Sequence, residues 1–101
     1  MKKVFISQLM RDRTDDDILS ERKEAIQLVK DAHGPDIEVI DSFLDIPSEG
    51  LKNPAVYYLG HSIILLSEAD IVVFCRDFGY GRATRIEEMI AYTYGIKTLY
   101  L

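Results

Sequence analysis

The chain has 101 residues and a formal net charge of −5, and 48% of its residues are hydrophobic. This length predicts one domain over residues 1–101 with a single core. The hydrophobic content argues against a disordered tail, and the negative charge argues against nucleic acid as a partner. A lone cysteine, Cys75, excludes an intrachain disulfide and a CxxC metal site. No signal-peptide pattern or membrane-length apolar run is present, so we expect a cytoplasmic protein with no membrane partner. We also expect no metal and no cofactor.

The first half of the chain alternates strand and helix patterns. Residues 4–6 form an apolar run that is typical of a buried strand. Thr14 suits a helix N-cap, and the aspartates that follow suit a first helical turn. That helix should end at Gly34, before a proline. Residues 37–41 predict a second strand, and residues 42–53 a loop containing Pro47. The inward residues of the helix should be Ile18, Ala25, Ile26 and Val29.

The second half repeats this alternation. Pro54 suits the first position of a helix. Residues 70–75 are almost wholly apolar, as expected of a central parallel strand buried on both faces. Residues 82–94 predict a third helix that Gly95 caps, and residues 96–101 a last strand. The inward residues should be Val56, Leu59, Ile63 and Leu66 on the second helix, and Ile86, Met89, Ile90 and Thr93 on the third.

Strands that alternate with helices predict an α/β domain with a parallel sheet and right-handed crossovers. The expected strand order is 2-1-3-4, a short flavodoxin-like sheet with helices on both faces. In that order the switch point lies between the first and third strands, where ligands bind beyond the carboxyl ends. The loops that begin at Ser7 and Arg76 should therefore face each other across one crevice.

The stretch from Gly79 to Met89 follows the central strand and opens the third helix. Gly79 and Gly81 allow close approach of a ligand, although a plain loop explains them equally well. Arg82 and Arg85 share a helix face and can hold a phosphate, or can pair with acidic neighbours. Glu87 is a candidate nucleophile or general base. From spacing alone, the plainer interpretation is a first-turn glutamate that favours the helix dipole or pairs with an arginine.

Residues at other strand ends complete the expected site. Ser7, Gln8 and Met10 would form its other wall, with Gln8 suited to a base or a ribose hydroxyl, or to capping of local backbone. Asp41 follows the second strand on the same sheet edge. Asp70 begins the third strand, on the opposite edge in the simplest topology, where a turn-capping role is the plainer interpretation.

Several motifs together resemble the small nucleoside 2-deoxyribosyltransferase-like proteins, a group of short bacterial and phage proteins mostly of unknown function. The resemblance runs nearly end to end. The motifs are KVFISQLMR at 3–11, EVIDSF at 38–43, YLGHS at 58–62, SEADIVVF at 67–74 and RATRIE at 82–87.

The resemblance implies a nucleoside site at the strand ends, with Glu87 as nucleophile and Asp70 as a second catalytic residue. It also implies a homo-oligomer. Gly81 stands where the transferases carry a further aspartate. We therefore expect either chemistry at the N-glycosidic bond of a nucleoside or nucleotide, or a non-catalytic module that binds or sequesters a nucleotide-derived molecule. A plain oligomeric scaffold is the third interpretation.

Overall fold

The computed structural model describes residues 1–42 and 49–101. It shows an α/β domain with one parallel sheet in the order β2-β1-β3-β4, as the sequence predicts. The strands are β1 (Lys2–Ser7), β2 (Ile37–Val39), β3 (Ile71–Phe74) and β4 (Lys97–Tyr100). The helices are α1 (Asp15–His33), α2 (Pro54–Leu66) and α3 (Arg82–Tyr94), with a short 3-10 turn, η1 (Phe78–Tyr80), before α3.

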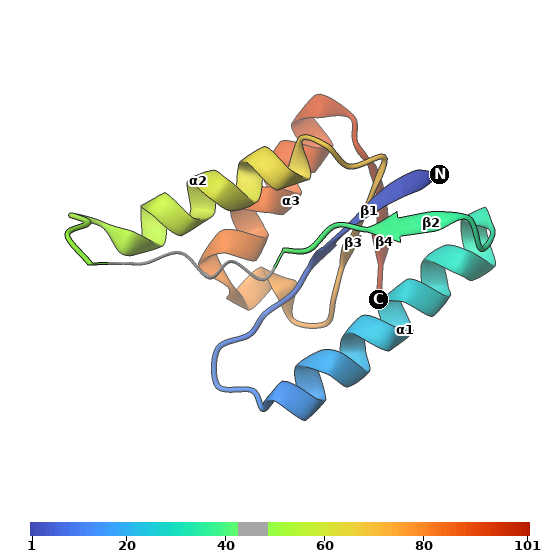
Figure 1. Ribbon diagram of the computed structural model, residues 1–101, viewed down its shortest axis with the longest axis horizontal. Helices are drawn as coiled ribbons and strands as arrows, with labels where there is room; N and C mark the ends of the chain where they lie inside the picture. Colours follow the sequence, from blue (N-terminus) through green and yellow to red (C-terminus); the bar gives the residue numbers. More distant parts are fainter. Residues whose placement is uncertain (43–48) are drawn as a thin grey trace.

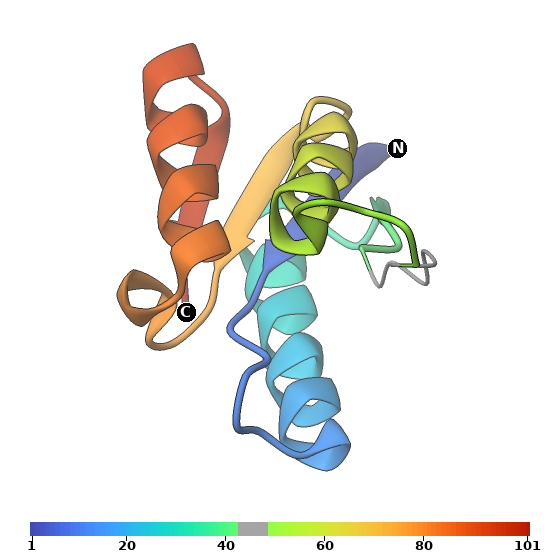
Figure 2. The same ribbon diagram turned by 90° about the vertical axis from the view of Figure 1, so that its left-hand side faces the viewer.

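Helices cover both faces of the sheet (Figure 1), with α1 on one side and α2 and α3 on the other. Successive side chains of β1 point to opposite faces of the sheet and so pack against different helices. Val4 and Ile6 pack with Ala25 and Val29 of α1, whereas Phe5 packs with residues of α2 and α3. In the view turned by 90° (Figure 2), α3 and α2 stand side by side on one face of the sheet, and α1 lies in the lower part of the view, on the other face.

The helix ends follow the predicted chemistry. The Thr14 side chain accepts a hydrogen bond from the Asp17 amide at 3.1 Å, and Pro54 begins α2. The sequence analysis did not identify the cap of α2, Asn53, whose Oδ1 accepts from the Val56 amide. Gly34 and Gly95 take positive φ values of 91° and 72° after α1 and α3, where residues with a Cβ are disfavoured. Part of the predicted 42–53 loop, including Pro47, lies outside the described residues.

Two predicted helix faces are right only in part: Leu66 of α2 and Ile90 of α3 pack in the core as expected, but other predicted residues do not. On α3 the buried residues are Thr84, Glu87 and Ala91, while Met89 is 60% exposed. On α2 only Leu66 is buried, and Val56 is 61% exposed. The apolar pattern misplaces the α3 face because polar side chains occupy its inner positions. Among the described residues, no helix is both long and apolar enough to cross a bilayer.

Candidate functional site

A buried carboxylate lies where β1, α2 and α3 meet. Glu87 projects from α3 and is only 4% exposed. The Ser7 hydroxyl, at the carboxyl end of β1, donates to its Oε1 at 3.0 Å. The Ser62 hydroxyl, from α2, donates to its Oε2 at 2.5 Å. Each carboxylate oxygen therefore has a hydroxyl donor from a different element, which fixes the plane of the group.

The environment of Glu87 acts on its protonation in two directions. Burial, the larger influence, raises the pKa of the carboxyl because it disfavours the charged form. The hydrogen bonds from Ser62 and Ser7 stabilise the carboxylate and lower the pKa, but they offset burial only in part. The pKa of Glu87 is therefore above its ordinary value. A carboxylate of raised pKa is a stronger base and nucleophile than one in water.

Two neighbouring cavities open above this carboxylate. An inner cavity of about 290 Å³ reaches Glu87, Ser7 and Ser62 and has an apolar wall that includes Phe5 and Leu59. An outer cavity of about 490 Å³ continues it towards the start of α3. Both are lined in part by the same residues, so they form one crevice. The shared residues are Gln8, Met10, Ala55, Leu59, Ala83 and Thr84.

The structure brings many of the predicted site residues to this crevice. Ser7, Gln8 and Met10 line the inner cavity together with Glu87. The outer cavity is lined by Gly81 and Arg82, and also by Arg11 and Tyr80. The switch point between β1 and β3 is thus where the crevice opens.

Other predicted residues do not line the crevice. Asp70 lies at the amino end of β3, where its carboxylate accepts a hydrogen bond from the Lys3 amide at 2.8 Å. Since β1 and β3 run parallel, with Ser7 opposite Phe74, this places Asp70 at the opposite edge from Glu87. Asp41, Gly79 and Arg85 are exposed and line neither cavity.

Glu87 is turned away from the arginines that precede it on α3. Arg82, which lines the outer cavity, and Arg85 are both exposed, whereas Glu87 is buried. Among the described residues, the hydrogen-bond donors to Glu87 are the two serines, and no ion pair links it to either arginine. The ion-pair interpretation of Glu87 is therefore not what the structure shows.

Sequence reasoning missed Ser62 and Thr84 as site residues. Ser62 is in the middle of a helix of apolar residues, where no pattern distinguishes a lining hydroxyl from a surface one. Thr84 Oγ1 donates to the Phe78 carbonyl and closes the turn that leads into α3. A polar residue one turn before Glu87 on the same helix face was the available signal.

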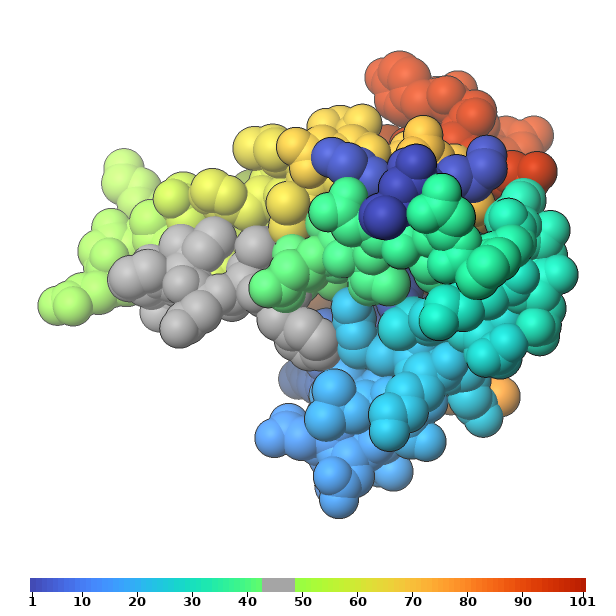
Figure 3. Space-filling model, turned by 45° about the vertical axis from the view of Figure 1, so that its right-hand side comes forward, coloured from blue at the N-terminus to red at the C-terminus, as the bar shows by residue number. Residues whose placement is uncertain are grey.

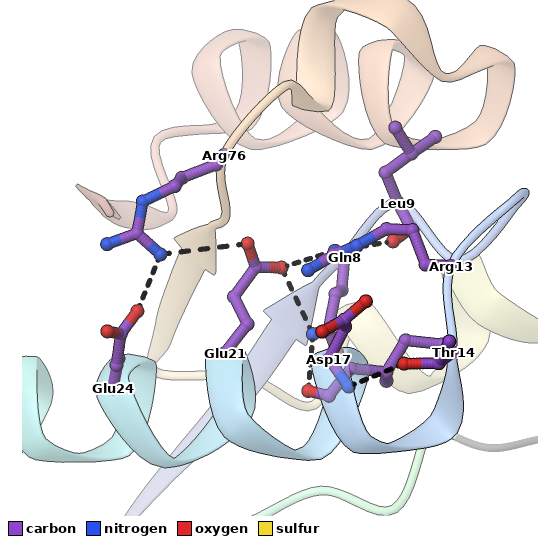
Figure 4. A network of polar contacts seen from close by, with 9 residues as sticks. Gln8, Leu9, Arg13, Thr14, Asp17, Glu21, Glu24 and Arg76 are labelled. Atoms are coloured by element: carbon purple, nitrogen blue, oxygen red, sulfur yellow. Dashed lines mark hydrogen bonds and ion pairs between the residues drawn. The ribbon is translucent and has the colours of Figure 1, made fainter.

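The amide of Gln8 has partners on α1 rather than in the crevice. Its Nε2 donates to the Ile18 carbonyl at 2.8 Å and to Glu21 Oε1 at 3.1 Å. Glu21 is 4% exposed and also receives a hydrogen bond from Arg13 at 2.8 Å. Figure 4 shows this cluster, which Arg76 joins through the outer oxygen of Glu21. The cluster ties the loop after β1 to α1, and so holds one wall of the crevice.

The described part of the chain contains no group of three or more His, Cys, Asp or Glu side chains that could hold a metal. Cys75 is fully buried, and burial raises the pKa of its thiol to about 12. It is therefore a packing residue at the end of β3 rather than a nucleophile.

Comparisons with protein-family models, with curated proteins and with solved structures each gave no match.

Proposed function

We propose that the protein binds a nucleoside or nucleotide in the crevice and acts on its N-glycosidic bond, with Glu87 as the nucleophile. The observation that carries the proposal is the environment of Glu87. This carboxylate is buried at the end of a ligand-sized cavity, and one serine hydroxyl holds each of its oxygens. A carboxylate so placed suits attack on an anomeric carbon.

The proposed reaction begins with one carboxylate oxygen of Glu87, which accepts one serine hydrogen bond and keeps a further lone pair for attack. That oxygen would bond to the anomeric carbon while the carbon–nitrogen bond breaks and its electron pair leaves with the base. The departing base would take a proton from water. Water or a second base would then attack the same carbon, releasing the Glu87 carboxylate. The two serines would keep the carboxylate plane fixed throughout, which lowers the entropy lost on reaching the transition state.

The outer cavity favours a phosphorylated ligand. Arg11 and Arg82 both line it, and guanidinium groups bind phosphate oxygens through paired hydrogen bonds. The exposed ring of Tyr80 lies on the same wall and can stack on a base. A nucleoside 5′-monophosphate would therefore place its sugar near Glu87 and its phosphate towards the arginines.

A second candidate is binding without turnover. Among the described residues that line the two cavities, Glu87 is the only carboxylate. Glycosidases ordinarily use a second carboxyl group to protonate the leaving group. Asp70, expected as the second catalytic residue, is at the opposite sheet edge. This observation favours a module that holds a nucleotide-derived molecule without cleaving it.

One experiment separates the two functions. The purified protein is incubated with a panel of nucleosides and 5′-monophosphates, and free base is measured by chromatography. Glu87→Gln is compared with Glu88→Gln, a control on the adjacent residue, which faces Tyr100 instead of the crevice. Catalysis predicts base release that Glu87→Gln abolishes and Glu88→Gln preserves.

A nucleotide that raises the melting temperature without any base release would instead support the binding module. Neither release nor a thermal shift with any member of the panel would overturn both proposals and favour an oligomeric scaffold.

A further inference from the structure

The crevice has ionisable groups of opposite sign at its two ends. Among the described residues that line the inner cavity, Glu87 is the only acidic one, and none is Lys, Arg or His. The outer cavity is lined by two arginines, Arg11 and Arg82, and by no acidic residue of the described chain. With Glu87 ionised, the crevice is therefore negative at its inner end and positive at its outer end.

Two segments far apart in the sequence form walls of this crevice. Met10 and Arg11 come from the loop between β1 and α1, and Ala55 and Leu59 come from α2. In the space-filling view (Figure 3), α2 (yellow-green) and the first part of α1 (blue) stand apart on the surface of the molecule. A ligand held between these walls would have Glu87 at its inner end and Arg11 at its outer end.

Glu87 has hydrogen-bond donors but no cationic partner within the described part of the chain. Ser7 and Ser62 each donate to one carboxylate oxygen, and none of the ion pairs of the described residues includes Glu87. An unpaired carboxylate is costly to bury in its charged form, and a positive charge within about 4–6 Å favours that form. A ligand that brings a positive charge close to Glu87 would therefore bind better than the same ligand without the charge.

The departure of the base favours the same charge. When the carbon–nitrogen bond of an ordinary nucleoside breaks, its electron pair stays on the base, which leaves as an anion unless an acid protonates it. The described residues that line the two cavities include no carboxyl group besides Glu87, no imidazole and no ammonium group that could supply this proton. A base that already carries a positive charge leaves as a neutral molecule and needs no proton.

We propose that the crevice selects a nucleotide whose base is cationic, with the positive charge shared by the glycosidic nitrogen, as in a pyridinium nucleotide. This inference rests on the function proposed above and names its class of substrate. The charged nitrogen is one bond from the carbon that Glu87 would attack, and the phosphate would lie near Arg11 and Arg82. Tyr58 lines the inner cavity and Tyr80 the outer one, and the face of a tyrosine ring attracts a cation.

The reaction of such a substrate balances without a general acid. One Glu87 oxygen bonds to the anomeric carbon while the carbon–nitrogen bond breaks, and the released electron pair neutralises the charge on the ring nitrogen. The base leaves as a neutral molecule. Water then attacks the same carbon, and the electron pair of the broken carbon–oxygen bond returns to the Glu87 carboxylate. The products are the neutral base, the sugar phosphate and one proton, which passes to solvent.

Matched pairs of substrates test this selection. One pair is nicotinamide mononucleotide and its dihydro form, in which the ring is uncharged, and the other is N7-methylguanosine 5′-monophosphate and guanosine 5′-monophosphate. Free base is measured by chromatography, and the rate without protein is subtracted. General acid catalysis contributes about 100- to 10,000-fold to a rate, so kcat/KM should be at least about 100-fold higher for the charged member of each pair. Glu87→Gln should abolish this release, and Glu88→Gln should preserve it.

Binding gives a second readout, which needs no turnover. In isothermal titration calorimetry, the wild type should bind the charged member of each pair at least about tenfold more tightly than the neutral member. Glu87→Gln should lose this preference and Glu88→Gln should keep it.

Two results would overturn the inference, and they differ in what they say of the proposed function. Equal kcat/KM and equal affinity within each pair, or a preference for the neutral member, would overturn the selection of a cationic base while the proposed function stands. Neither release nor binding of any nucleotide, charged or neutral, would overturn both.

Discussion

Substitution by alanine should be costly at one of the two glycines before α3, Gly81, and almost neutral at the other, Gly79. A Cβ at Gly81 would overlap Thr84 Oγ1 and would lie 3.1 Å from Leu9 Cδ1. A Cβ at Gly79 would meet nothing within 4 Å. The backbone at Gly81, with φ −93° and ψ 141°, suits any residue. Gly81→Ala therefore acts chiefly through the lack of space for the Cβ and not through backbone strain.

The size of the effect follows from the contacts that must give way. Thr84 Oγ1 donates to the Phe78 carbonyl, and rotation of the threonine to make room loses that bond, worth about 1 kcal/mol. Crowding against Leu9 adds about 1–2 kcal/mol. Gly81→Ala should therefore lower the free energy of unfolding by about 2–3 kcal/mol. For a domain of this length, that corresponds to a fall in melting temperature of about 10–20 °C.

Thermal and urea denaturation measure this loss of stability in three variants: Gly81→Ala, Gly79→Ala and the double variant Gly81→Ala/Thr84→Ala. Removal of the Thr84 hydroxyl relieves the overlap, so the double variant should be more stable than the sum of the single changes by about 1 kcal/mol or more. Gly79→Ala should be within about 0.5 kcal/mol of the wild type. A fully stable Gly81→Ala, or strictly additive effects, would refute the steric reasoning.

Three further predictions concern charged and ionisable groups. Burial raises the pKa of Glu87 above 4.5 in the folded state. The folded protein therefore holds this proton more tightly than the unfolded chain, and it loses stability as the pH rises from about 4.5 upward. In urea denaturation between pH 4 and 7, the stability of Glu87→Gln relative to wild type should increase with pH. Cys75 should react with a disulfide reagent at pH 8 at least about 100-fold more slowly in the folded protein than in urea, since its pKa is about 12. Arg76→Ala breaks an exposed ion pair with Glu24 and a long contact of 3.9 Å to Glu21, so it should change stability by less than about 1 kcal/mol. Arg13→Ala removes the 2.8 Å hydrogen bond to the buried Glu21 carboxylate and should lower stability by about 2 kcal/mol. Equal losses in these two variants would contradict the last prediction.

The fold could be predicted because its signals are local. Thr14 and Pro54 start helices by backbone chemistry, and Gly95 ends one by its positive φ. The alternation of strands and helices then restricts the topology to a few arrangements. The observed strands differ from the predicted ones by one to two residues at their ends, where hydrogen bonding to a neighbouring strand, and not composition, decides the boundary.

The site was harder to predict because its contacts are not local. Glu87 could be proposed from its position after a strand and loop, but its orientation could not. The pattern placed Met89 inward, whereas the structure turns Glu87 and Thr84 inward. Glu87 accepts hydrogen bonds there from the hydroxyls of Ser7 and Ser62, and Thr84 donates to the Phe78 carbonyl. Ser62 belongs to the site only through the packing of α2 against α3. The topology already placed Asp70 at the opposite sheet edge, as the structure confirms; only the resemblance made it a candidate for the site.

The hydrogen bond between Ser7 and Glu87 joins residues 80 positions apart, and that between Ser62 and Glu87 joins residues 25 apart. Closing loops of such length is entropically unfavourable until the intervening strands and helices have assembled. The buried environment of the Glu87 carboxylate therefore forms only when the sheet is complete. A fragment or a partly folded chain would expose Glu87 to water as an ordinary acid. Proton uptake by this one side chain thus reports on whether the whole molecule has reached its native arrangement.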